Sequence, residues 1–259
     1  MNKIAFTLVL NGRPYIEEQA KIIPHIFDHW YIVEGYSLPV KDTSWCKNID
    51  ISKFTNNGLS NDGTTEFLDT LSDDNVTIIR KPPGQFWNGK TEMCNSFMPY
   101  VENSILMQFD VDEIWKPDTL TDVLDYAEHN GGFDGMLFKC NYYVGKDLIT
   151  LGENCYGNNP GEWSRLWKIR EKTSWKTHEP PRIHGLHNFL DRNFTSQKGW
   201  IFDHYAYATE SQLKFKEDYY GYQGAVNSWK RLQNEKVFPV NLRDYFPWVN
   251  DNSQVIKYV

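Results

Sequence analysis

The pattern of apolar and polar residues over the first 35 positions predicts a strand, then a helix, then a second strand. Residues 3–10 form an apolar run that ends at Asn11-Gly12-Arg13-Pro14, where turn residues precede a proline suited to a helix start. Residues 15–26 then repeat apolar side chains at helical spacing, and residues 29–35 form a second apolar run. This order predicts a βαβ unit and therefore a parallel sheet.

The same alternation returns after a long polar segment. Residues 36–59 are rich in Pro, Asp, Asn, Ser and Lys and predict a surface loop, of a length that is often functional inside a compact domain. Residues 60–68 predict a helix start, residues 76–80 a third strand and residues 88–97 a further helix. Residues 105–110 form an apolar run that is typical of a strand buried on both faces.

The second half of the chain mixes helices with shorter strands. We expect helices over residues 119–129 and 210–220, and strands over residues 134–143 and 200–207. Residues 163–169 alternate between apolar and polar side chains, which predicts a half-buried strand.

Three carboxylates directly follow the apolar run of residues 105–110. In an extended segment Asp110 and Asp112 point the same way, and ligands bind beyond the carboxyl ends of strands in open α/β sheets. Carboxylates that converge repel each other unless a cation lies between them, and Mg²⁺ and Mn²⁺ accept carboxylate oxygens together with substrate phosphates. These acids therefore indicate a divalent metal site; the alternative is a solvated turn in which Asp118 or Asp122 caps the next helix.

Composition narrows the class of protein. The 259 residues are 40% hydrophobic and carry a formal net charge of −7, which indicates a globular domain and argues against binding nucleic acid through phosphate attraction. The chain has no apolar run long enough for a membrane span and no signal-peptide pattern, so we expect a cytoplasmic protein with at most peripheral membrane contact. The cysteines, with no CxxC spacing, are expected to be reduced thiols: Cys46, Cys94, Cys140 and Cys155.

Several short motifs in a fixed order resemble the family-two glycosyltransferases with the GT-A fold. In the first half they are Val9-Leu10-Asn11-Gly12, Val33-Glu34-Gly35, Ser60-Asn61-Asp62-Gly63-Thr64, the helix around Lys90 and Asn95, and Asp110-Val111-Asp112-Glu113. The second half resembles the branch that includes lipopolysaccharide-core β-glucosyltransferases, on the motifs Arg165-Leu166-Trp167, Trp175 with His178-Glu179, His204-Tyr205, Lys214-Phe215-Lys216 and Tyr219-Tyr220-Gly221.

This resemblance implies one α/β domain over residues 1–259, with a mostly parallel, Rossmann-like central sheet flanked by helices. Residues 1–118 would bind the nucleotide sugar, and residues 119–259 would form an acceptor-side extension with C-terminal helices. The implied reaction is metal-dependent, inverting transfer of a sugar from a nucleotide-diphosphate sugar to a hydroxyl of a glycan or glycoconjugate. The segment 36–59 departs from the usual pattern, because typical members pass directly from the second-strand acid into the next helix.

The resemblance also implies contacts for the nucleotide sugar. Glu34 would contact the nucleoside base beside the backbone of Leu10 and Asn11; its alternative is a solvated strand end. Lys90 would contact the diphosphate or the base, since an ammonium suits a phosphate; its alternative is a surface lysine. Asp110 and Val111 would also contact the donor.

The same resemblance implies a metal site built from both halves. Asp112 would be the direct ligand of the ion, Asp110 a ligand or a ribose contact, and Glu113 a supporting neighbour. His204 matches a C-terminal ligand of this fold, and imidazole favours Mn²⁺ over Mg²⁺. Outside this context a lone histidine is more often structural.

Glu179 is the predicted catalytic base, with Glu162 as its rival and Asp203 in third place. The alternative for Glu179 is an ion pair with Arg165 or Arg182. On the sugar or acceptor side, aromatic faces and a guanidinium suit hydroxyl-rich ligands, and the predicted residues are Glu162, Trp163, Arg165 and Trp175.

Two other classes of protein compete with this assignment. A nucleotidyltransferase would also use an α/β sheet and acidic metal ligands, but residues 8–16 lack its glycine-rich, basic phosphate loop. A non-catalytic sugar-binding protein would explain the many aromatic residues, 10 Trp, 15 Tyr and 15 Phe, yet it has no need of the acids at 110 and 112.

Overall fold

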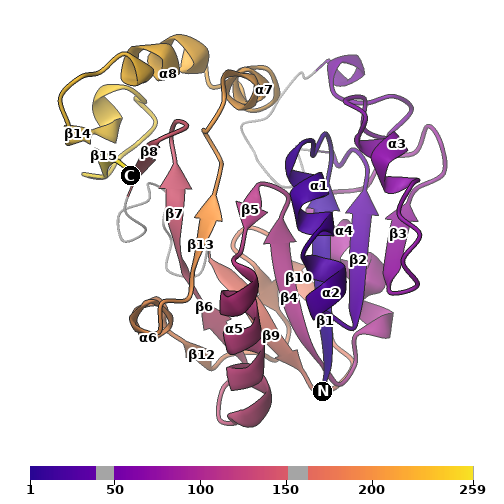
Figure 1. The fold of residues 1–259 in the computed structure, drawn as a ribbon. Coiled ribbons are helices and arrows are strands. Elements are labelled where there is room, and N and C mark those ends of the chain that lie inside the picture. The colour runs from indigo at the N-terminus through magenta and orange to yellow at the C-terminus, as the bar shows by residue number, and fades with distance from the viewer. Residues whose placement is uncertain (39–49, 151–162, 259) are drawn as a thin grey trace.

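The central element of the computed structural model is a mixed sheet of seven strands (Figure 1). The structure describes residues 1–38, 50–150 and 163–258. In spatial order the strands are β12 (Phe189–Leu190), β6 (Gly135–Leu137), β9 (Ser164–Ile169), β4 (Ser104–Asp110), β1 (Asn2–Val9), β2 (His29–Glu34) and β3 (Val76–Arg80). Four of the six pairings are parallel, and only those of β9 are antiparallel, so the sheet is largely parallel as predicted.

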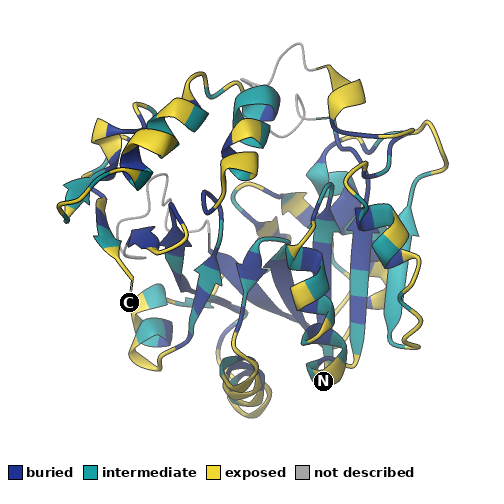
Figure 2. Cartoon of the chain, turned by 45° about the horizontal axis from the view of Figure 1, so that its top comes forward, coloured by how far each residue is buried: buried dark blue, intermediate teal, exposed yellow. Residues whose placement is uncertain are grey.

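Helices cover both faces of this sheet. One face carries α1 (Tyr15–Ala20), α2 (Ile23–Ile26) and α5 (Pro117–His129), and the other carries α4 (Lys90–Phe97). The side chains of β4 alternate between them: Phe109 packs against Phe27 below α2, whereas Leu106 belongs to the cluster of Phe97 on α4. β4 is buried on both faces, and every residue before Asp110 is buried. Figure 2 shows buried central strands beneath helices with exposed outer faces.

A second sheet of six strands lies beside the first. Its order is β14 (Val240–Asn241), β15 (Gln254–Lys257), β8 (Leu148–Thr150), β7 (Lys139–Tyr143), β13 (Ile201–His204) and β5 (Glu113–Ile114). Only Val111 and Asp112 separate β4 from β5, so the chain passes from one sheet to the other at the acidic motif. A small third sheet pairs β10 (Trp175–Thr177) with β11 (Arg182–Ile183).

The remaining helices lie mostly toward the edges. Among the described residues they are α3 (Thr64–Leu68), α6 (Arg192–Gln197), α7 (Glu210–Tyr220), α8 (Ala225–Gln233) and the short 3₁₀ helices η2 (Ile51–Lys53), η3 (Met98–Tyr100) and η4 (Leu242–Asp244). Within the described ranges, no helix combines the length and the apolar composition needed to cross a bilayer.

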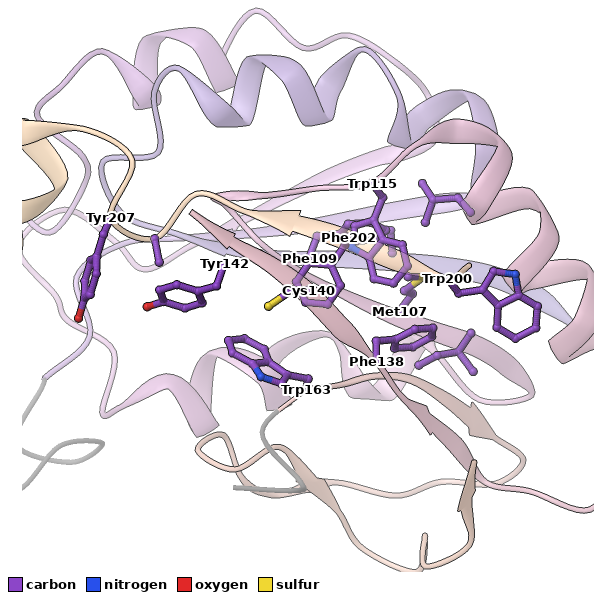
Figure 3. Close-up of a cluster of buried hydrophobic side chains, with 14 of the residues drawn as sticks. Met107, Phe109, Trp115, Phe138, Cys140, Tyr142, Trp163, Trp200, Phe202 and Tyr207 are labelled. Atoms are coloured by element: carbon purple, nitrogen blue, oxygen red, sulfur yellow. The ribbon is translucent and has the colours of Figure 1, made fainter. Parts of the chain in front are cut away.

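An aromatic core joins the two sheets (Figure 3). Trp115 stacks on Phe202 with ring centroids 4.9 Å apart and meets Phe138 edge-on at 5.0 Å. In Figure 3 this row continues toward Tyr142 and Tyr207. The many aromatic residues therefore include a set that builds the core.

Three sequence predictions need correction. Residues 15–26 form two helices, because Pro24 lies where a continuous helix would need its missing N–H. Residues 134–143 form β6 and β7, which belong to different sheets. The strand predicted to be half-buried, β9, is buried at every residue because it lies between β4 and β6.

Candidate active site

A cavity of about 880 Å³ lies at the carboxyl ends of β1, β4 and β13. The amino end of α4 and one face of α7 complete its walls. Strands β2 and β4 flank β1 on opposite sides, so the strand order reverses there. Such a reversal opens a crevice in which α/β sheets bind ligands.

Asp110 ends β4 and lines this cavity. Its Oδ2 accepts a hydrogen bond from Nη2 of Arg165 at 2.9 Å, and its Oδ1 accepts one from Nε2 of Gln108 at 2.8 Å. Burial raises the pKa of Asp110, but Arg165, His178 and the hydrogen bond from Gln108 together outweigh burial and leave the pKa below its usual value.

Glu113 shares a hydrogen-bond partner with Asp110. It is fully buried, and its carboxylate accepts hydrogen bonds from Nε and Nη2 of Arg165 at 2.6–3.0 Å. Arg165 therefore bridges Glu113 and Asp110, which fixes the guanidinium and orients the Asp110 carboxylate.

Asp112 pairs with His204 across the junction of the two sheets. Its Oδ1 lies 3.4 Å from Nε2 of His204. Burial raises the pKa of Asp112, but the imidazole and the Lys216 ammonium outweigh burial and lower it to about 2. Burial lowers the pKa of His204, and Asp112 outweighs burial to raise it. Each member of the pair therefore stabilises the charged form of the other.

Backbone pairing brings these two side chains together. β5 pairs antiparallel with β13 so that Glu113 lies opposite His204, and the N–H of Tyr205 donates to the carbonyl of Asp112 at 2.9 Å. On the other side, the Gln19 amide of α1 donates to the carbonyls of Asp110 at 2.7 Å and of Glu113 at 3.2 Å.

Glu179 also lines the cavity, from the loop between β10 and β11. Its Oε1 accepts a hydrogen bond from Nζ of Lys90 at 2.8 Å, so its partner is neither Arg165 nor Arg182. The Lys90 ammonium holds the pKa of Glu179 well below its usual range.

Most of the predicted site residues meet in this one cavity. It is lined by Leu10, Asn11, Lys90, Asp110, Val111, Asp112, Trp163, Arg165, Glu179 and His204. Three predicted site residues are not among them: Glu162, Glu34 and Trp175. Glu162 lies outside the described residues, as do Cys46 and Cys155.

Glu34 and Trp175 do not line the cavity. Both oxygens of Glu34 are engaged inside the protein: Oε2 accepts from Nε of Arg80 at 2.6 Å, and Oε1 accepts from Oγ1 of Thr65 at 2.5 Å. Trp175 is buried against Phe6 and belongs to the core beneath α4. An acid at the end of a strand can form an internal ion pair instead of contacting a ligand, as Glu34 does. A tryptophan can pack in the core instead of lining a sugar site, as Trp175 does.

The metal prediction can be compared with this geometry. Among the described residues, no group of three or more His, Cys, Asp or Glu side chains is placed to hold an ion. Asp112 and His204 nevertheless offer an oxygen and a nitrogen 3.4 Å apart, close to the separation of about 3 Å for neighbouring ligands of an octahedral ion. Two protein ligands fit a divalent ion whose other positions are filled by phosphate oxygens and water.

Sequence reasoning assigned no role to several cavity residues. Lys216 and Tyr220 come from α7, Gln108 from β4 and Tyr142 from β7. Lys216 belongs to the motif Lys214-Phe215-Lys216, but the sequence does not show which face of its helix lies toward the cavity.

Comparisons with known proteins add little to this site. No family model and no curated protein matches the chain. Two crystal structures of S. aureus TarS are similar to it: TarS 1-349 (14% identity, TM-score 0.42, covering 65% of this chain and 47% of that one) and TarS (13%, 0.43, 65% and 28%). The chain therefore spans less than half of either. At these TM-scores the likeness supports neither a family nor an activity, and the functional inference rests on the cavity.

Proposed function

We propose that this protein is a GT-A-type glycosyltransferase that moves a sugar, with inversion, from a nucleotide-diphosphate sugar to a hydroxyl of a glycan or glycoconjugate. The observation that supports this most is the convergence of Asp112, His204, Lys90 and Glu179, from distant parts of the sequence, on one cavity at the switch point of the sheet. Its volume suits a nucleotide sugar.

In this proposal the donor lies along the ends of β1 and β4. The backbone at Leu10 and Asn11 forms the nucleotide side, with Val111 beside it. As part of this proposal, residues 1–118 would bind the nucleotide sugar, and residues 119–259 would supply His204 and the acceptor side.

Asp112 and His204 would hold Mn²⁺, or Mg²⁺, against the diphosphate. Such an ion is a Lewis acid that stabilises the charge developing on the leaving group, worth several kcal/mol. Arg165 keeps Asp110 directed into the same cavity, where that carboxylate contacts the donor or the ion.

Glu179 would accept the proton of the acceptor hydroxyl. In the structure its carboxylate is held by Lys90, which makes it a weak base. When Lys90 turns to a donor phosphate, Glu179 loses the cation nearest to it and its pKa rises. Donor binding would thereby activate the base. Trp163 would line the sugar or acceptor side.

Replacement of Asp112 by Ala tests the proposal. We expect Mn²⁺-dependent transfer or hydrolysis, measured over a panel of nucleotide sugars, to fall by more than about 100-fold, because one of two protein ligands of the ion is lost. Asp122→Ala, which removes an exposed acid of α5, should retain full activity. A wild-type protein that binds no nucleoside diphosphate and turns over no nucleotide sugar would refute the proposal.

A further inference from the structure

Four Lys and Arg side chains line the cavity, and three of them have a carboxylate partner. Lys90 pairs with Glu179 at 2.8 Å, Arg13 with Glu17 at 2.6 Å, and Arg165 with Asp110 and Glu113 at 2.6–2.9 Å. Lys216 of α7 differs: within the part of the chain that the structure describes, it makes no ion pair.

The surroundings of Lys216 do not compensate its charge. Its Nζ lies 5.0 Å from the ring centroid of Tyr207 and 5.6 Å from that of Tyr220. Burial lowers the pKa of this lysine, Asp112 and Glu179 raise it, and Lys90 lowers it further, so the pKa stays below its ordinary value. Contacts with two rings offset only part of the cost of removing an ammonium from water. Neither Asp112 nor Glu179 forms an ion pair with Lys216 in the part of the chain that the structure describes, so an anion bound in the cavity would stabilise this ammonium.

The charges around Lys216 indicate what that anion is. Lys90 of α4 and Lys216 of α7 both line the cavity and repel each other, and Asp112 attracts Lys216. In the structure Glu179 compensates Lys90, but when Lys90 turns to the donor, as proposed above, both ammonium groups need negative charge from the ligand. A diphosphate carries enough charge for both lysines and for a cation held by Asp112.

We propose that Lys216 binds the diphosphate of the donor, from the wall of the cavity formed by α7. This inference rests on the proposed function and deepens it. Because α7 belongs to the second half of the chain, the diphosphate would be bound by both halves, by Lys90 from residues 1–118 and by Lys216 from residues 119–259. An ammonium on each side balances the leaving group's charge without depending on the ion alone.

The test compares nucleoside diphosphates with the corresponding nucleosides. UDP, GDP, ADP, CDP and dTDP are titrated into wild-type protein with MnCl₂ by calorimetry, and the tightest is then titrated into each variant alongside its nucleoside. We expect Lys216→Met to weaken the diphosphate by about tenfold or more and to leave nucleoside binding unchanged, since only the phosphates contact the ammonium. Lys216→Arg should restore most of the affinity.

Lys214 provides the matched control. It lies two residues earlier on α7, is exposed and pairs with Asp218 at 2.8 Å, so Lys214→Met should bind the diphosphate as the wild type does. Equal diphosphate affinity in wild type and Lys216→Met would overturn the assignment of Lys216 and leave the proposed function standing. Equal weakening of nucleoside and diphosphate would also overturn it, because the lysine would then act by packing. If the wild type binds none of the five diphosphates, both proposals fall.

Discussion

Glu179 is the residue on which proton transfer depends in the proposed reaction. Replacing it with Gln keeps its size and removes the basic oxygen, so we expect transfer to fall by about 10²–10⁴-fold. Donor binding should persist, because Lys90 loses an internal partner and keeps its charge. Transfer rate and nucleoside-diphosphate affinity, measured on the same preparation, separate the two effects.

Glu171→Gln is the control for this variant, since Glu171 is exposed in the turn after β9. Full transfer by Glu179→Gln would show that the proton goes to another group. Glu162 would then become the first candidate, as the sequence already suggested.

Residue types predicted the candidate site well where chemistry restricts the choice. The sequence placed Asp110 and Asp112 at the end of a buried strand, and both acids line the cavity, whereas their role as ligands stays a prediction. Glu34 was misplaced because the sequence could not show that Arg80, on the neighbouring strand, reaches the same carboxylate. A pattern identifies the end of a strand, whereas the direction of one side chain depends on its neighbours in space.

At the scale of elements, Gln19 connects α1 to the acidic motif. Its amide donates to the carbonyls of Asp110, Val111 and Glu113, and its Oε1 accepts from Oγ1 of Thr7 at 3.0 Å. Gln19→Leu would leave these buried groups without their partner, at a cost of about 1–3 kcal/mol. We expect Tm to fall by about 2–10 °C in a calorimetric scan.

Gln197→Leu, at the exposed end of α6, should leave Tm unchanged and serves as the control. A Tm of Gln19→Leu equal to that of the wild type would mean that other donors satisfy these carbonyls.

Long elements with a strong period were predicted closely. β3 and α7 have the predicted bounds, and β4 begins one residue earlier than expected. Short strands were missed, because β8, β11, β12 and β14 have only two or three residues each and show no period. Their existence follows from the pairing partners they meet, which sequence spacing does not reveal.

For the molecule as a whole, acid stability should depend on Asp134. Its carboxylate accepts hydrogen bonds from the backbone N–H groups of His187 and Asn188 at 3.0 Å and pairs with Arg170 at 2.7 Å, beside the edge strand β12 and its neighbour β6. Burial raises its pKa, but these partners outweigh burial and lower the pKa to about 2.

Since this pKa is lower in the folded protein than in the unfolded chain, the carboxylate stabilises the fold above about pH 4, and the gain is lost as the pH falls toward 2. We expect Asp134→Asn to lower the free energy of unfolding by about 1–2 kcal/mol at pH 7, with solvent screening allowed for, and the difference from wild type to shrink toward pH 2. Urea titrations at several pH values measure it. A difference independent of pH would assign the loss to the hydrogen bonds alone.

The arrangement of the two sheets was beyond sequence reasoning. The order of strand, helix and strand predicted the parallel part, but it could not show that the chain would divide between β6 and β7 or that β5 would cross to a second sheet. Both features depend on strand pairings between residues far apart in the sequence. The pairings of β13 with β5 and β7 form the cavity wall on which His204 lies.

The pairing of β5 with β13 fixes the positions of the two proposed metal ligands, Asp112 and His204, independently of which side chains they carry. Main-chain hydrogen bonds set the distance between positions 112 and 204, whatever side chains those positions carry. Each ligand can therefore be exchanged, carboxylate for imidazole or the reverse, while the scaffold is retained. Evolution or an engineer could retune the preference between Mn²⁺ and Mg²⁺ by single substitutions at this pair of positions.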